Sequence, residues 1–308
     1  MTVKKQSSLW RQVSVITITA IGLYLIIRLL PTGTNLSHMD FRAGASSVEF
    51  CDPANPQFMP VVSVRSPVEM TFVTHSDVLA GREVRVVATL KTVTGKLIAP
   101  EDLLVVHTQK LHLLVVDPTL VDYQHLHPMP GKNAGEWAFA FTPRRAGVYR
   151  VFADFTPVAT ARGLYASADL KVDSVDGPGV MGNETVSIAN NRTFESFGYM
   201  FELRTSAEPV KAGQMIDLVF TVKRRDGETV ALEPVMGAFA HLVAFDRARS
   251  GYAHLHPNEI DLTRALDLLQ PRLTFKLTIP RAGRYVIWSQ VKLDGRELFA
   301  PFWFEVLP

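Results

Sequence analysis

The stretch Pro143-Arg-Arg-Ala-Gly-Val-Tyr149 returns later in the chain as Pro280-Arg-Ala-Gly-Arg-Tyr285. In both copies the proline and the Ala-Gly pair are typical of a turn. The tyrosine that follows opens a run of alternating apolar residues, which is the pattern of a half-buried β-strand. The two stretches therefore predict the same turn and strand at two places in the chain.

The repeat extends well beyond these stretches. Ala80-Gly81 matches Ala212-Gly213, and the last strand expected in the first half, Leu164–Val172, matches Leu298–Val306. An insertion at Asn258–Gln270 is the main difference, and its spaced apolar residues predict a short helix. Runs of β-type residues separated by turn signals predict the strands of the first half: Val68–Thr74, Glu83–Leu90, Leu111–Val116, Trp137–Phe141, Tyr149–Phe155 and Tyr165–Val172.

The position of the two tyrosines indicates the type of fold. A tyrosine just after a turn, at the start of a strand, resembles the tyrosine corner of immunoglobulin-like sandwiches, where its hydroxyl bonds a nearby backbone group. The single cysteine, Cys51, excludes an intramolecular disulfide. We therefore expect an all-β protein with two tandem immunoglobulin-like or fibronectin III-like β-sandwiches that lack the disulfide.

The N-terminus predicts an anchor. Lys4, Lys5 and Arg11 precede the apolar stretch Val13–Ile27, and we favour a single uncleaved transmembrane helix over a cleaved signal sequence. The basic residues ahead of it predict that the bulk of the chain lies in the periplasm or extracellular space, with the membrane as a partner. The expected organisation is an anchor or signal sequence at 1–30, a linker at 31–65, a sandwich at 66–174, a linker at 175–183 and a sandwich at 184–308.

Charge excludes one class of partner. The formal net charge is only +2, and no basic run is interleaved with aromatic residues. Such a chain is not expected to bind nucleic acid.

The histidines repeat with the strands. Six of the nine histidines lie in two blocks of the form H-x12-H-x-H, in which Asp, Tyr and Pro also stand at matched offsets. The first block contains His112, His125 and His127, and the second contains His241, His254 and His256.

Strand geometry gives this spacing a meaning. Residues i and i+2 of a strand point to the same side, so the two histidines of each H-x-H pair project together. The x12 segment is long enough for the chain to turn and bring the third imidazole beside them. Three neutral imidazoles suit copper first and zinc second, with a position left open for another ligand.

One further residue with a metal-binding side chain precedes each block. His107 lies five residues before His112, and Met236 lies five residues before His241. A methionine thioether is a soft ligand that prefers Cu(I), so both residues are added to the expected metal sites.

The alternative interpretation is structural. The duplication would also preserve histidines that are hydrogen-bonded fold elements, with Asp117 or Asp246 orienting an imidazole, in a non-catalytic interaction module of the cell envelope. Catalysis is not expected, because the chain contains none of the common hydrolase, zinc-protease or phosphate-binding motifs. Asp154 is a conceivable acid or base, but its counterpart in the second half is Gln290, so we expect a surface or supporting role for it.

These segments also carry a resemblance. His112–Asp117, Asp122-Tyr-Gln-His-Leu-His-Pro128 and Arg150–Pro157 resemble bacterial exported or membrane-anchored proteins whose immunoglobulin-like domains have a His-x-His-Pro signature. More loosely, the chain is similar to periplasmic copper-resistance sandwiches, but it lacks their Met-rich loop and N-terminal histidine ligand. The resemblance supports the fold and the location, and copper only by association. Together with the histidine blocks, it leads us to expect a membrane-tethered protein that delivers, buffers or senses metal and exchanges it with an envelope protein.

Overall fold

The structure is a computed structural model that describes residues 3–29, 36–41, 58–61, 66–175 and 189–308. Cys51 and most of the two expected linkers fall outside these ranges. The N-terminal segment forms the helix α1, Val3–Leu29. Among the described residues, however, no helix is both long and apolar enough to cross a membrane, so the predicted transmembrane anchor is not supported.

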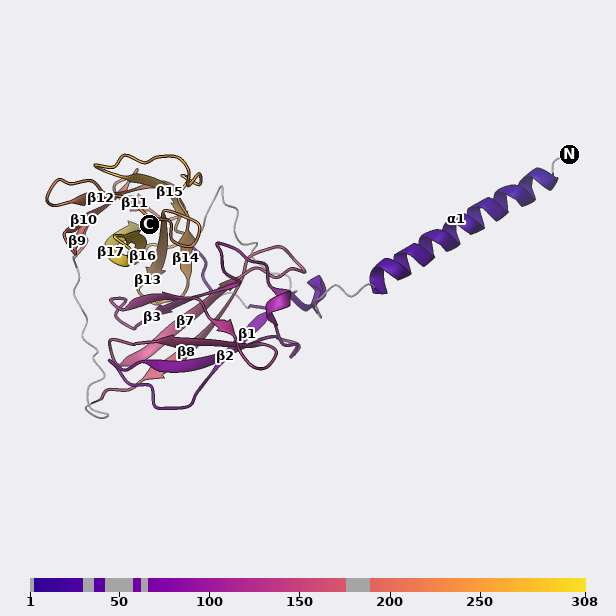
Figure 1. The fold of residues 1–308 in the computed structure, drawn as a ribbon, viewed down its shortest axis with the longest axis horizontal. Helices are drawn as coiled ribbons and strands as arrows, with labels where there is room; N and C mark the ends of the chain where they lie inside the picture. Colours follow the sequence, from indigo (N-terminus) through magenta and orange to yellow (C-terminus); the bar gives the residue numbers. More distant parts are fainter. Residues whose placement is uncertain (1–2, 30–35, 42–57, 62–65, 176–188) are drawn as a thin grey trace. The chain divides into compact units, whose positions relative to one another are not determined.

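The rest of the described chain is built almost entirely from strands (Figure 1). Besides two short 3-10 helices, η1 (His38–Phe41) and η2 (Pro100–Asp102), it contains β1 (Val68–Thr74), β2 (Val84–Thr92), β3 (Leu111–Val116), β4 (Tyr123–Leu126), β5 (Met129–Pro130), β6 (Glu136–Phe141), β7 (Gly147–Phe155), β8 (Leu164–Val172), β9 (Thr193–Ser196), β10 (Tyr199–Thr205), β11 (Val210–Lys211), β12 (Met215–Arg224), β13 (Ala240–Asp246), β14 (Tyr252–Leu255), β15 (Arg272–Thr278), β16 (Gly283–Leu293) and β17 (Arg296–Leu307).

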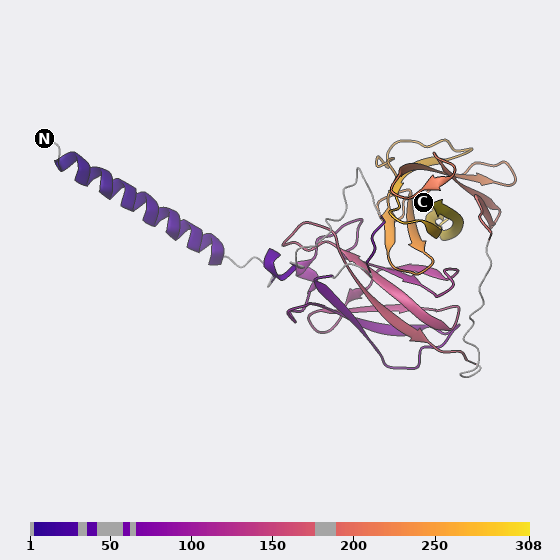
Figure 2. The ribbon, with the colours of Figure 1, turned by 180° about the vertical axis from the view of Figure 1, so that it is seen from behind.

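The strands form two β-sandwiches whose central strands have the same order, although the edge strands β5, β9 and β11 each occur in one sandwich only. In the first, the sheet β1-β2-β6-β5 faces the sheet β4-β3-β7-β8. In the second, the sheet β15-β12-β10-β9 faces the sheet β11-β17-β16-β13-β14. Each sandwich buries its own apolar core, and the strands of the second are the orange and yellow ones in Figures 1 and 2. The expectation of an all-β protein with two tandem β-sandwiches is confirmed, whereas the immunoglobulin-like or fibronectin III-like type stays a prediction.

Both tyrosine corners are present. The Tyr285 hydroxyl donates to the carbonyl of Arg281, four residues upstream, at 3.0 Å. The Tyr149 hydroxyl accepts from the backbone N–H of Arg145 at 3.1 Å and donates to the buried carboxylate of Asp122 at 2.6 Å. These bonds hold the turn that leads into β7 and β16, as the sequence predicted.

A third apolar core joins the sandwiches. The outer face of the β4-β3-β7-β8 sheet packs on the matching face of the second sandwich, and equivalent residues meet with approximate two-fold symmetry. Tyr123 packs against Trp288 with ring centroids 5.9 Å apart, and its counterpart Tyr252 packs against Phe152 at 5.3 Å. The Trp288 indole N–H also donates to the carbonyl of Leu120 at 3.1 Å. The sandwiches are therefore docked through aromatic residues on corresponding strands.

The insertion at 258–270 differs from its prediction, because it forms turns and bends instead of a short helix. Asp261 accepts hydrogen bonds from the backbone and hydroxyl of Thr263, and Asp267 accepts from the backbone of Leu269. Such local side-chain bonds compete with helical hydrogen bonding. Leu266 packs on the core of the second sandwich, whereas Ile260, Leu262 and Leu269 are exposed, so the apolar spacing does not mark a buried helix face.

Candidate metal centre

The histidines lie on the faces through which the sandwiches dock. On β3, Leu114 and Val116 belong to the core between the sandwiches, and His112 shares their side of the strand. On β4, Tyr123 belongs to the same core, so His125 points the same way. The turn between β3 and β4 brings these histidines together, because the two strands are antiparallel neighbours.

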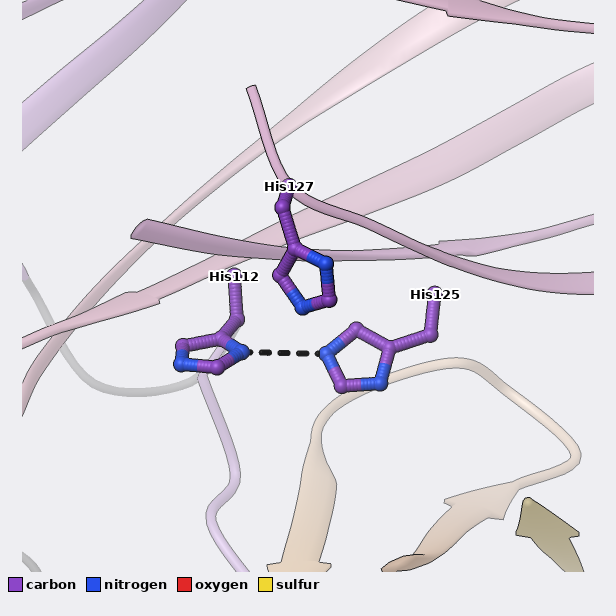
Figure 3. Close-up of side chains that lie close together, drawn as sticks. All are labelled: His112, His125 and His127. Carbon is purple, nitrogen blue, oxygen red and sulfur yellow. Dashed lines mark hydrogen bonds between the residues drawn. The ribbon is translucent and has the colours of Figure 1, made fainter. Parts of the chain in front are cut away.

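Each block of sequence forms one cluster of imidazoles. We call His112, His125 and His127 triad one, and His241, His254 and His256 triad two. Within each triad, one ring nitrogen per residue can be chosen so that all three lie within 4.8 Å of one another. Figure 3 shows the ring of His127 pointing toward the space between His112 and His125.

Hydrogen bonds determine which nitrogen carries the proton in triad one. Nε2 of His112 lies 3.1 Å from the carbonyl of Val106, which can only accept, so this nitrogen is the donor. Nδ1 of His125 lies 2.8 Å from Oε1 of Gln290. The amide nitrogen of Gln290 donates to Glu297 at 2.8 Å, which fixes the orientation of the amide, so His125 Nδ1 is also a donor.

Triad two follows the same scheme. Nε2 of His241 donates to the carbonyl of Val235 at 2.9 Å. Nδ1 of His254 donates to the carboxylate of Asp154 at 3.1 Å, which replaces the glutamine amide of triad one. In both triads the first two histidines are therefore held by acceptors on the side away from their partner ring.

The remaining nitrogens of these histidines face each other. A neutral imidazole has one donor and one acceptor nitrogen, so Nδ1 of His112 and Nε2 of His125 both present lone pairs, 3.1 Å apart. Nδ1 of His241 and Nε2 of His254 do the same at 3.3 Å. The third histidines add Nε2 atoms of His127 and His256, which are buried and have no hydrogen-bond partner within the described chain. Facing lone pairs of this kind are able to bind a cation.

The neutral form of these rings is favoured by their surroundings. Burial lowers the pKa of every histidine in both triads, and it brings the pKa of His241 to about 3. Neighbouring imidazoles lower the pKa of His125 and His254 further, because two adjacent rings cannot both be protonated cheaply. Burial also raises the pKa of Asp154. Neutral imidazole is the form that binds a metal ion.

The two triads are in contact with each other. Ring centroids are 5.2 Å apart for His125 and His254, 5.6 Å for His112 and His254, and 6.0 Å for His125 and His241. His107 joins the group from the first sandwich, and its ring stacks on that of His256 at 3.5 Å with an interplanar angle of 18°. Seven histidines thus form one cluster at the interface.

The structure places the predicted residues as follows. It brings together His107 and all six histidines of the triads, whereas Met236 occupies the turn equivalent to that of His107, half-buried, and its role as a ligand stays a prediction. The idea that Asp117 or Asp246 orients an imidazole is wrong. Asp117 accepts bonds from Thr119 and Val121 in the β3–β4 turn, and Asp246 accepts bonds from Ser250.

Two orienting residues were not recognised as such from the sequence. Asp154 and Gln290 pair in register with His112 and His241 on the neighbouring strand, yet each bonds a histidine of the opposite sandwich. Their equivalence was visible as a substitution between the repeats. The contact itself was not, because it depends on the docking of the two sandwiches.

The fold and this site define an all-β protein of two tandem β-sandwiches with a histidine cluster at the interface between them. The chain belongs to the family described as a domain of unknown function, DUF8832, which matches residues 65–172 and 194–307. That description assigns no activity, so the resemblance to copper-resistance proteins stays a prediction.

The other comparisons find only weak similarities to known proteins. A search of curated proteins finds no match. Among solved structures, FdeC, an Escherichia coli adhesin, is similar over 78% of this chain with 17% identity and a TM-score of 0.24. The chain spans 64% of the length of that adhesin structure. The fibronectin(III)-like modules of Clostridium thermocellum CbhA are similar over 77% of this chain and 94% of their own, with 10% identity and a TM-score of 0.19.

Proposed function

We propose that the protein binds transition metal ions, copper first and zinc second, at one site per triad, and that it delivers, buffers or senses them. The observation that carries this proposal is the pair of facing lone pairs in each triad, at 3.1 and 3.3 Å. Two acceptor nitrogens at that distance repel unless a cation lies between them. Ligands of a tetrahedral ion with bonds of about 2.0 Å stand roughly 3.3 Å apart, so the spacing suits such an ion.

The ligand set favours borderline and soft metals. Triad one would use Nδ1 of His112 with Nε2 of His125 and His127, and triad two would use the same atoms of its three histidines. Imidazole nitrogen binds copper and zinc and discriminates against calcium and magnesium, which prefer oxygen. At equal geometry copper(II) binds more tightly than zinc(II), which is why copper comes first.

The hydrogen bonds of the rings support this proposal. A ligating histidine usually donates its second N–H to a carbonyl or carboxylate, which orients the ring and raises its basicity. Val106 and Asp154 serve His112 and His254 in this way. The side chains of His127 and His256 are less buried than those of His112 and His241, so these two residues would be the first that an entering ion meets.

The second candidate is a structural or partner-binding module without metal. It is favoured by the bonds from His125 to Gln290 and from His254 to Asp154, which tie the two sandwiches together without any ion. This interpretation explains the first two histidines of each triad. It leaves the Nε2 atoms of His127 and His256 buried without a role.

Metal titration of the full chain separates the two candidates. We expect two equivalents of copper(II) or zinc(II) to bind, and one equivalent after His125→Ala plus His127→Ala. The matched variant His254→Ala plus His256→Ala should also bind one, whereas His75→Ala, at an exposed position, should still bind two. Absence of binding in a parent chain with native circular dichroism would leave the structural module as the function.

The cellular setting stays a prediction. We expect the sandwiches to lie in the periplasm or extracellular space, where an envelope protein would supply or receive the ion. We also continue to expect that the protein is not an enzyme.

A further inference from the structure

The two triads are as close to each other as their own members are. Ring centroids within the triads are 4.7 to 5.5 Å apart. Between the triads, the nearest pair, His125 and His254, is 5.2 Å apart, within that same range. No apolar layer separates the two groups, so ions in the two triads would interact directly.

Each triad is completed by the opposite sandwich. The central ring of triad one is held by Gln290 of β16, and the central ring of triad two is held by Asp154 of β7. These two residues occupy equivalent positions in the repeat, as shown by their register against His112 and His241. The arrangement is therefore reciprocal, and neither triad has its full set of hydrogen bonds within one sandwich.

The two triads differ in the group that accepts the hydrogen bond of their central histidine. Triad one receives a neutral amide oxygen from Gln290, whereas triad two receives a carboxylate oxygen from Asp154. The charge of Asp154 also acts on His112 of triad one, so the difference between the triads lies in the hydrogen bond. A carboxylate that accepts the N–H of an imidazole draws its proton away and makes its other nitrogen a stronger ligand. Triad two should therefore bind a divalent cation more tightly than triad one.

A seventh ring also distinguishes triad two. His107 comes from the first sandwich and stacks on His256, which belongs to the second. Its counterpart in the repeat is Met236, which cannot stack in the same manner. Triad two is thus supported from across the interface by two residues, Asp154 and His107.

We propose that the seven histidines form a single dinuclear metal centre across the interface, in which triad two takes the first ion and triad one takes the second more weakly. This inference rests on the proposed metal binding. It adds the order in which the two triads bind their ions and the effect of one bound ion on the other. Like charges a few ångströms apart in a partly buried site repel, so the first ion weakens the binding of the second. Asp154 is a positioning residue that acts through His254.

Copper(II) titration of the full chain, followed by competition with a chelator and by electron paramagnetic resonance, tests this order. We expect two steps of unequal affinity, an isolated-ion spectrum after one equivalent, and a spectrum broadened or diminished by magnetic coupling after two. Asp154→Asn should weaken the first step by about 10- to 100-fold and change the copper hyperfine splitting of the first ion.

A variant that gives triad one a carboxylate provides the second part of the test. Gln290→Glu combined with Glu297→Gln supplies triad one with a carboxylate while removing the neighbouring acid that the amide nitrogen now contacts. We expect it to strengthen the weaker step toward the stronger one, and Glu297→Gln alone to leave the order of the two steps unchanged.

Different outcomes separate the two proposals. Two equal and independent steps with uncoupled spectra would overturn the dinuclear centre and leave the metal-binding function intact. An effect of Asp154→Asn confined to the weaker step would also overturn the order of filling. Binding of no metal by the natively folded parent would overturn the proposed function itself.

Discussion

Nδ1 of His125 lies 2.8 Å from Oε1 of Gln290, a residue 165 positions later in the chain and in the other sandwich. The bond between His254 and Asp154 mirrors it across 100 positions. The histidine cluster is therefore a property of the docked pair of sandwiches, and the integrity of that docking should control metal affinity.

Replacing Trp288 by alanine tests this dependence. Its ring packs on Tyr123 and its N–H bonds the carbonyl of Leu120, so its loss opens the core between the sandwiches. We expect a loss of about 3–5 kcal/mol in the free energy of unfolding, with a fall of at least about tenfold in metal affinity. Denaturant unfolding and metal titration measure the two effects.

Phe220→Ala is the matched control, because Phe220 is fully buried inside the core of the second sandwich alone. It should destabilise the fold by a similar amount and leave metal affinity nearly unchanged. Equal losses of affinity in the two variants would show that the docking face has no special role.

The metal-free protein should lose stability in acid. The histidines of the triads have pKa values lowered by burial, about 3 for His241, so the unfolded chain binds more protons than the folded one below about pH 6.5. The buried neutral histidines therefore cost no stability above that pH. The free energy of unfolding decreases as the pH falls from there toward the pKa values of the folded state. Each such histidine contributes a slope of at most about 1.4 kcal/mol per pH unit.

Urea unfolding between pH 7.5 and pH 5 measures this slope. The variant His254→Ala plus His256→Ala should show a shallower dependence than the parent, and His75→Ala should show the same dependence as the parent. A flat profile in the parent would contradict neutral, buried imidazoles.

Bound metal should stabilise the fold by mass action. At a free metal concentration 100-fold above the dissociation constant, one site adds about 2.7 kcal/mol to the free energy of unfolding. Thermal unfolding with and without copper or zinc should therefore show a higher Tm, reversed by a chelator. A chain lacking His125, His127, His254 and His256 should show no such shift, and an equal shift in that chain would place the binding elsewhere.

The two tyrosine corners should contribute different amounts to the free energy of unfolding. Tyr285→Phe removes one neutral hydrogen bond to the carbonyl of Arg281 and should cost about 1 kcal/mol. Tyr149→Phe also removes a donor from the buried carboxylate of Asp122 and should cost about 1.5–3 kcal/mol. Denaturant unfolding measures both, and metal affinity should stay at the parental value in each variant. A larger cost at Tyr285 would be inconsistent with the hydrogen bonds seen.

The sequence was sufficient for the longer strands and for the pairing of the two histidines in each His-x-His motif, because both depend on local periods. The short strands β5, β9 and β11 were not predicted. The two-residue period placed His125 and His127 on one side, and the tyrosine after each turn indicated the sandwich. The short helix expected in the insertion was wrong for a local reason, the turn-forming bonds of Asp261 and Asp267.

The docking of the sandwiches could have been suspected from one signal. Leu113–Val116 and Leu242–Phe245 are uninterrupted apolar runs, and all their residues are buried, whereas a strand with one exposed face alternates. Such runs show that a second face is covered, but they do not identify what covers it. The contact between the triads and the partners of His125 and His254 followed only from the docked structure.

X-ray absorption at the metal edge of the full chain, loaded with one and then two equivalents of copper or zinc, tests the proposed site most directly. The structure predicts about three imidazole nitrogens at roughly 2.0 Å around each ion, with the multiple-scattering pattern of histidine rings. A spectrum with oxygen neighbours alone, or with a single imidazole per ion, would contradict the assignment of the two triads as metal ligands.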